Sequence, residues 1–135
     1  MIRLLYISTA RQQPTPEMLA DILRASRRNN AVAGVSGLLI VGGRRFLQAL
    51  EGPELAVRTT YDRIHRDPRH FAVVQLVREQ INERQFAGWS MGAQVGGRPG
   101  EKASVSEAVT TLVAPIADPT LRGYFQGFAE RQAAA

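Results

Sequence analysis

Two spacings of hydrophobic residues alternate along the chain, and they predict alternating strands and helices. Apolar residues three or four positions apart predict a helix that begins at Thr15-Pro16 and runs to about Arg28. The same spacing predicts a second helix that opens at Gly52-Pro53 and ends before Asp67-Pro68. Short continuous apolar runs predict strands at 4–8, 35–41, 44–51, 71–81 and 89–95.

The order of these elements predicts the fold class. A β-α-β-β-α-β order with one further strand is typical of a ferredoxin-like α+β fold, with an antiparallel sheet and two helices on one of its faces. Gly42-Gly43 lies between the second and third strands. Because both positions of a two-residue hairpin turn favour positive φ, this pair predicts the turn.

The last third of the chain reads differently. A glycine- and proline-rich stretch at 96–100 predicts a linker, and two short helices follow, over 104–114 and from Asp118-Pro119 onward. Helices of this length are unstable alone, so we expect them to pack on the uncovered sheet face or on a partner. The prediction is a domain over 1–96 and a helical extension over 97–135. Tyr124 and Phe125 are candidate partner anchors, with burial on the sheet as the alternative.

Composition narrows the function classes. A chain of 135 residues suits one compact domain. It has no cysteine, which excludes disulfides, thiol catalysis and thiolate metal sites; no metal is expected. No apolar run is long enough for a signal peptide or a membrane span, so a cytoplasmic protein is expected. The net charge of +5 comes from scattered arginines, which fits either a solvated surface or an anionic partner.

Two polar residues occupy positions where the strand pattern demands apolar ones. Gln48 lies between Phe46 and Leu50, which point to the same buried face of their strand. Tyr6 follows Leu4 on the same face of the first strand. Leaving a buried polar group without a partner costs about 1–3 kcal/mol. A structural pair between Tyr6 and Gln48, or a bound polar ligand, would each satisfy them.

Two further features have ordinary explanations as well as functional ones. Asn29-Asn30 lies at the predicted end of the first helix, where asparagine often adopts the left-handed conformation that stops a helix. Trp89 and Met91 are predicted to project from one face of the last strand, where aromatic and methionine side chains commonly pack in a core.

Together these residues suggest a binding groove. Two helices over one sheet face leave a groove between them, into which Asn30, Ile22 and Ile64 would point from the helices. Tyr6 and Gln48 would point into it from the sheet. Flat apolar walls with amide groups along one edge suit a planar heteroaromatic ring.

Several stretches, in this order and spacing, resemble one known family. They are Leu5–Ser8, Ser26–Asn30, Val35–Leu39, Phe46–Gly52, Asp67–His70 and Phe86–Met91. The chain resembles, over roughly its first 95 residues, a BLUF domain, the blue-light sensor that uses FAD. Each stretch alone is a weak signal, whereas all of them in register are specific.

The resemblance implies a role for each matching residue. Tyr6 would donate an electron and a proton to the excited flavin, and Gln48 would bridge Tyr6 and the ring. Asn30, with Asn29, would contact the polar edge of the ring. The other implied roles are the ring sandwich (Ile22, Ile64), the cofactor's polar tail (Arg69, His70) and relay of the signal (Trp89, Met91). FAD would be bound non-covalently, because no cysteine is present to form a flavin–thiol adduct.

The resemblance also implies a photosensory signalling protein rather than an enzyme. No effector domain is recognisable after residue 100, so output is expected through self-association or a downstream protein, by way of the C-terminal helices or the open sheet face. A ferredoxin-like RNA- or protein-binding module without photochemistry is the alternative, although the aromatic stacking motif of RNA-recognition domains is missing. An acylphosphatase-type hydrolase would want a glycine-rich loop after the first strand, and Ser8–Gln13 is not one.

Overall fold

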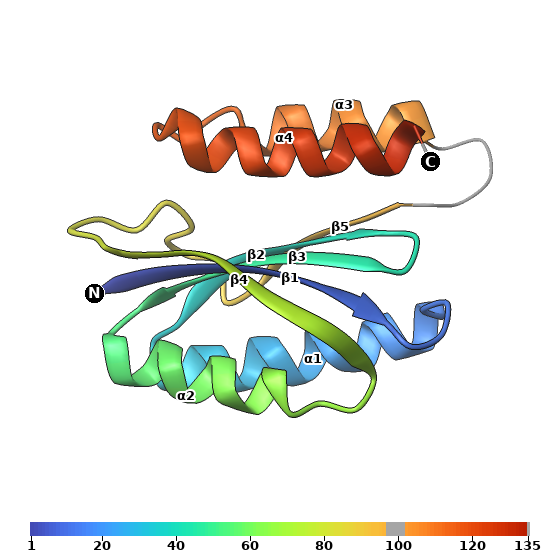
Figure 1. Ribbon diagram of the computed structural model, residues 1–135. Coiled ribbons are helices and arrows are strands. Elements are labelled where there is room, and N and C mark those ends of the chain that lie inside the picture. The colour runs from blue at the N-terminus through green and yellow to red at the C-terminus, as the bar shows by residue number, and fades with distance from the viewer. Residues whose placement is uncertain (97–101, 135) are drawn as a thin grey trace.

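A computed structural model describes residues 1–96 and 102–134 as three layers. The sheet forms the middle layer, with α1 and α2 on one side and α3 and α4 on the other (Figure 1). The elements are β1 (Ile2–Ala10), α1 (Pro16–Ala33), β2 (Ser36–Gly42), β3 (Arg45–Gly52), α2 (Glu54–His65), β4 (His70–Gln80), β5 (Gly92–Gly96), α3 (Lys102–Val113) and α4 (Pro119–Ala134). Most of the predicted linker at 96–100 lies outside the described residues.

The sheet has the strand order β4-β1-β3-β2-β5. The first four strands pair antiparallel, and with α1 and α2 on one face they form the predicted ferredoxin-like arrangement, so the α+β fold class is confirmed. The fifth strand makes the sheet mixed, because β5 pairs parallel to β2 from Leu38–Gly92 to Gly42–Gly96. Parallel pairing requires a crossover, and the chain makes it by passing from edge strand β4 to the opposite edge.

Helix α1 begins as predicted and ends later. Thr15 caps its first turn, its hydroxyl accepting a hydrogen bond from the Met18 N–H at 3.1 Å. The helix continues to Ala33, where Gly34 adopts φ 73° and donates its N–H to the Asn30 carbonyl. The predicted helix end at Asn29-Asn30 is therefore wrong, because a glycine that takes the left-handed conformation at little cost follows a few residues later.

Two other boundaries differ from the prediction. Gly42 pairs with Arg45, so the hairpin turn is Gly43-Arg44, one residue later than expected. The last strand begins at Gly92 rather than Trp89, because a turn precedes it: Gly88 has φ 85°, and the Trp89 N–H bonds to the Phe86 carbonyl at 3.0 Å. Trp89 and Met91 therefore lie before β5 and do not share one of its faces.

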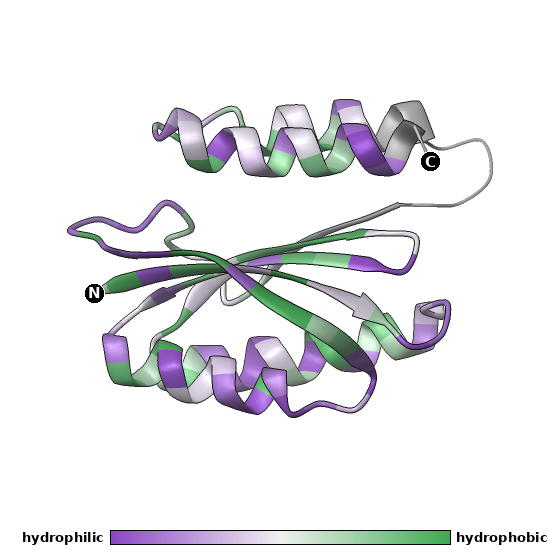
Figure 2. Cartoon of the chain, in the orientation of Figure 1, coloured by the Kyte–Doolittle hydropathy of each residue, from purple (hydrophilic) through white to green (hydrophobic). Residues whose placement is uncertain are grey.

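The two faces of the sheet belong to two separate cores. In β3, Phe46 and Leu50 face the α1–α2 side, whereas Leu47 and Ala49 face the α3–α4 side. In Figure 2 much of the strands is coloured as hydrophobic, in agreement with a core on each side of the sheet. None of the described helices is long and apolar enough to cross a membrane.

The C-terminal helices pack on the sheet face that α1 and α2 leave uncovered. Val109 and Val113 of α3 lie in one cluster with Leu38 of β2. Phe125 of α4 is fully buried there, and Tyr124 is partly buried against the same cluster. Of the two interpretations of Phe125, burial on the sheet is correct and a free partner anchor is wrong.

Gly37 of β2 offers a stability test, because a side chain there would collide with backbone. A Cβ at Gly37 would lie 2.1 Å from the Ala49 carbonyl oxygen and 3.2 Å from the Met91 Cε. We expect Gly37→Ala to lower the free energy of unfolding by more than about 3 kcal/mol, since the strand cannot move away. Gly123→Ala is the control: a Cβ in this helix meets nothing within 4 Å, so stability should rise by about 0.5–1 kcal/mol. Urea denaturation of both variants measures the difference; equal midpoints would contradict it.

Candidate functional site

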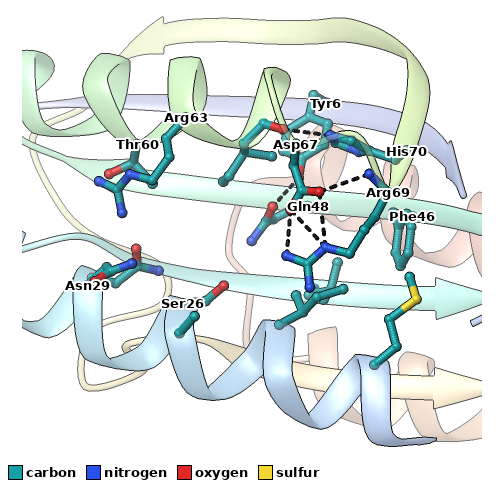
Figure 3. A pocket seen from close by; sticks show the side chains of 16 residues that line it. Tyr6, Ser26, Asn29, Phe46, Gln48, Thr60, Arg63, Asp67, Arg69 and His70 are labelled. Atoms are coloured by element: carbon teal, nitrogen blue, oxygen red, sulfur yellow. Dashed lines mark hydrogen bonds and ion pairs between the residues drawn. The ribbon is translucent and has the colours of Figure 1, made fainter. Parts of the chain in front are cut away.

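A groove between α1 and α2 opens onto the sheet, and its empty space, counted together with the open solvent at its mouth, is about 760 Å³. One wall of the groove is formed by residues of α1 that share a helix face, and the opposite wall by residues near the end of α2. Figure 3 shows Ser26 and Asn29 on α1, Thr60 and Arg63 on α2, and Gln48 on the sheet around this space. Its lining residues are Tyr6, Met18, Ile22, Ala25, Ser26, Asn29, Asn30, Leu39, Phe46, Gln48, Thr60, Arg63, Ile64, Asp67, Arg69 and His70.

The structure brings together most of the residues that the sequence singled out. The groove is lined by Tyr6, Ile22, Asn29, Asn30, Gln48, Ile64, Arg69 and His70. Sequence reasoning missed Ser26, Thr60 and Arg63 as lining residues. Helical spacing could have found them, because Ser26 lies three residues before Asn29, Thr60 four before Ile64, and Arg63 three after Thr60.

The centre of the site is a chain of hydrogen bonds across neighbouring strands. Tyr6 of β1 and Gln48 of β3 face each other in the sheet register, and the Tyr6 hydroxyl donates to Gln48 Oε1. Gln48 Nε2 in turn donates to Met91 Sδ at 3.3 Å. Tyr6, Gln48 and Met91 are all buried, with 3%, 4% and 2% of their surface exposed. The Gln48 amide thus connects the phenol to the segment before β5.

The chemistry of the partners fixes the orientation of the Gln48 amide. A thioether sulfur can only accept a hydrogen bond, so the NH₂ group must face Met91. The amide oxygen is then left to accept from the phenol. Exchanging the two amide ends would place an acceptor against the sulfur and a donor against the phenolic oxygen. The contact with Met91 therefore depends on which way this one amide points.

Burial sets the protonation state of Tyr6. Removal from water raises the pKa of the Tyr6 phenol well above its ordinary value of 10.0, with a smaller contribution from Tyr61. The Tyr61 ring lies 5.5 Å from the Tyr6 ring, centroid to centroid. Tyr6 is therefore a neutral hydrogen-bond donor over the whole physiological range.

The raised pKa of Tyr6 predicts an alkaline loss of stability. In the unfolded chain Tyr6 ionises near pH 10, whereas in the folded chain it stays protonated. Its stabilising contribution is therefore complete below about pH 10 and declines as the pH rises further. The unfolding free energy of the wild type relative to Tyr6→Phe should be constant from about pH 7 to 9 and fall above pH 10. A difference that stays flat above pH 10 would contradict the assignment.

His70 forms part of the wall behind Tyr6. Its Nε2 lies 2.6 Å from the Ile64 carbonyl oxygen, and its Nδ1 lies 2.8 Å from Ser8 Oγ. A carbonyl only accepts, so Nε2 carries the proton, and in the neutral ring Nδ1 accepts from the Ser8 hydroxyl. Both nitrogens are thus engaged by protein groups.

Charged groups gather where α2 meets β4. Arg69 binds the Asp67 carboxylate, with its Nε 3.0 Å from both oxygens and its Nη2 2.5 Å from Oδ2. The Arg69 hydrogen bond lowers the pKa of Asp67, and the same hydrogen bond raises the pKa of Arg69. Arg63 of α2 lines the same groove (Figure 3). The groove therefore carries guanidinium groups from α2 and from the segment before β4, and amide groups from α1 and the sheet.

Helix α1 holds the segment that precedes β5. Asn30 Nδ2 donates to the Ser90 carbonyl at 2.7 Å, and Arg27 Nε donates to the Met91 carbonyl at 3.0 Å. Trp89 does not line the groove; its ring stacks on the Phe86 ring with the centroids 6.2 Å apart, and the residue is 38% exposed. Of the two predicted relay residues, Met91 is the one in contact with Gln48.

The fold and the groove define an α+β domain with a partly polar pocket between two helices and one face of the sheet. A sequence model described as "Sensors of blue-light using FAD" (BLUF) matches residues 1–92. The chain belongs to the BLUF family.

Individual relatives agree with this assignment. The Escherichia coli blue light- and temperature-regulated antirepressor BluF is 34% identical over 83 residues, 62% of this chain and 21% of that protein. Photoactivated adenylate cyclase subunit beta of Euglena longa is 37% identical over 89 residues, 65% of this chain and 10% of that protein. The chain thus spans about a fifth or less of these curated relatives.

Some solved structures match over almost the whole chain. The dark-state structure of BlrB, a BLUF protein, has a TM-score of 0.74 at 25% identity, covering 99% of this chain and 96% of that one. The BlsA photo-activated state has a TM-score of 0.70 at 25% identity, covering 96% and 94%. These two matches include the C-terminal helices as well as the sheet and groove.

Proposed function

We propose that this chain senses blue light through the Tyr6–Gln48 pair, with FAD held non-covalently in the groove between α1 and α2. The observation that supports it most is the buried chain of hydrogen bonds from Tyr6 through Gln48 to Met91 at the groove wall. Such a chain can be reversed by one amide without moving any net charge.

The residues of the groove fit the cofactor. Ile22 and Ile64 are apolar walls on opposite helices and would hold the flat ring between them. Asn29 and Asn30 offer amides, which both donate and accept, to a ring edge with the same duality. Arg69, with Arg63, suits the anionic tail of a dinucleotide. FAD rather than a shorter flavin rests on the family's description.

Tyr6 and Gln48 would carry out the chemistry. Bound FAD supplies a blue-absorbing ring that accepts an electron when excited. Tyr6 gives up an electron together with its phenolic proton, because a buried phenol releases neither alone at low cost. Its proton leaves along the existing hydrogen bond toward Gln48 Oε1. The electron and the proton would then both return to Tyr6, so no net oxidation remains, while the Gln48 amide is left reorganised and the bonds that it makes to its surroundings have changed.

Met91 would sense the change in Gln48. With the amide reversed, Gln48 no longer offers an N–H to the Met91 sulfur, and the thioether loses its partner. Rearranging one or two buried hydrogen bonds supplies about 1–3 kcal/mol, enough to shift a conformational population but too little to unfold the domain. The response is therefore a displacement of the segment before β5 and of the helices packed near it.

The output would be non-enzymatic. Cyclase activity belongs to the names of far longer relatives, of which this chain covers about a tenth. We propose that the signal passes to a protein partner or a second copy through the C-terminal helices. Their inner face already covers the sheet, so the outer face of α3 and α4 is the candidate surface.

An absorption spectrum tests the proposed function. Protein loaded with FAD should be yellow, shift its visible band to longer wavelength under blue light, and return in the dark. Protein that stays colourless after refolding with FAD would favour the binding-module alternative. Flavin-bound protein with identical spectra before and after illumination would refute photosensing itself.

A further inference from the structure

The connection between β4 and β5, residues 81–91, passes from one core of the protein to the other. Phe86 is buried in the core under α3 and α4, whereas Met91 is buried in the core under α1 and α2. Between them the chain rounds the edge of β2, where the Trp89 carbonyl accepts from the Gly37 N–H at 3.0 Å. Figure 2 colours much of this connection as hydrophilic, so polar contacts as well as apolar packing must fix its path.

Glu51, near the end of β3, supplies the most buried of these polar contacts. Its side chain is fully buried. Oε1 accepts from the Phe86 N–H at 2.6 Å and the Ser36 hydroxyl at 3.2 Å, and Oε2 accepts from the Gln85 N–H at 3.0 Å. Arg3 Nε lies 3.4 Å from Oε2. A buried carboxylate is tolerated only with such partners.

Arg84 ties the same part of the connection to the sheet. Its Nη1 donates to Ser36 Oγ at 2.9 Å and to the Glu51 carbonyl at 3.3 Å, and its Nη2 donates to the Gly34 carbonyl at 2.6 Å. The turn at Trp89 follows directly, through its N–H bond to the Phe86 carbonyl. The segment from Phe86, which Glu51 holds by its N–H, to Met91 is therefore short and has few ways to move independently.

The connection also touches the C-terminal helices. The Phe86 ring packs edge-on against Phe125 at 6.1 Å, and Gln85 Oε1 accepts from the Ala117 N–H at 3.3 Å. The residues that Glu51 holds by their backbone are thus the same residues that contact the α3–α4 layer. Met91, at the far end, contacts Gln48.

We infer that Glu51 is a positioning residue for the photochemical site: by holding Gln85 and Phe86 it keeps Met91 Sδ against Gln48, and it directs any displacement of Met91 into α3 and α4. This inference rests on the proposed light response. Glu51 acts from the opposite side of the sheet and through the backbone of the connection, without touching the groove.

Glu51→Gln and Glu79→Gln form a matched pair for the test. Both remove a carboxylate that contacts the buried Arg3, since Glu79 Oε1 lies 2.6 Å from Arg3 Nη1. Only Glu51 binds the backbone of the connection, and a glutamine there replaces one acceptor oxygen with an NH₂ group that cannot accept.

We expect FAD-loaded Glu51→Gln to keep the dark spectrum and the light-induced shift, and to recover in the dark roughly fivefold faster, because the loosened connection lets Met91 return more easily. Backbone amides of residues 85–91 should also exchange with deuterium faster in the dark. Glu79→Gln should match the wild type in both measurements. If Glu51→Gln fails to fold, Arg84→Gln, which loosens the same connection and leaves the carboxylate in place, should give the same two changes.

Three results would overturn the inference. In the first, Glu51→Gln is less stable but recovers at the wild-type rate, which makes Glu51 a purely structural residue. In the second, Glu79→Gln accelerates recovery as much, which assigns the effect to Arg3 and β1. In the third, amide exchange at 85–91 is unchanged in a variant with altered recovery. A wild type without any light response would instead remove the proposed function, and the inference with it.

Discussion

Tyr6→Phe is expected to bind FAD and to show no light-induced shift, with an amplitude below about a tenth of the wild type, because a phenyl ring has no O–H to donate or release. The phenylalanine ring should still fit in the space of the tyrosine ring, since Tyr6 packs in the core beneath the groove. The substitution leaves Gln48 Oε1 without its donor, so stability should fall by about 1–3 kcal/mol. Difference spectra before and after illumination, with bound flavin quantified, measure the outcome.

Tyr61→Phe is the matched control for this variant. It makes the same chemical change in a ring whose centroid lies 5.5 Å from that of Tyr6. Tyr61 is not among the partners of Gln48, and its variant should retain the shift. A full shift in Tyr6→Phe would disprove the role of Tyr6, and loss in both variants would point to the packing of the two rings instead of the phenolic proton.

Gln48→Leu is expected to abolish the light-induced spectral shift as completely as Tyr6→Phe does, for a different reason. Leucine can neither accept from Tyr6 nor donate to Met91, so both bonds of the buried chain disappear together. The amplitude should again fall below about a tenth of the wild type, with a stability loss of about 1–3 kcal/mol from the unpaired phenol.

Gln75→Leu controls for loss of a glutamine next to β1. Gln75 of β4 is also aligned with Tyr6 in the sheet, on the opposite side from Gln48, but it is exposed. Its variant should photoconvert normally. If Gln48→Leu kept a reversible shift, the amide would not be part of the photochemistry, whatever it contributes to folding.

The sequence was sufficient to predict the groove because its residues obey simple periodicities. Strand alternation placed Tyr6 and Gln48 on one face, and helical spacing placed Ile22 and Ile64 on facing helices. The four-strand core followed from element order. Their roles with FAD stay predictions, because the structure describes the protein groups alone.

What the sequence could not reveal depends on contacts between distant segments. Glu51 reads as a polar residue at a strand end, which is usually solvated. Its burial is tolerated because the backbone N–H groups of residues 85 and 86, distant in sequence, donate to its carboxylate. The parallel pairing of β5 depends on where the chain re-enters the sheet. Likewise, local pattern could not choose between Trp89 and Met91, because the turn at Gly88 leaves both residues before β5, where strand alternation does not apply.

The sheet is a single layer, and its face toward α3 and α4 is covered by those two helices. Leu38, Ile40 and Leu47 are shielded from water together with Phe125 and Phe128 of α4. A chain shortened after Gly96 would expose this hydrophobic sheet face to solvent and would self-associate through it. Experiments on the first 96 residues alone would then record an artificial association, and the intact polypeptide is the proper object for any study of how these molecules assemble.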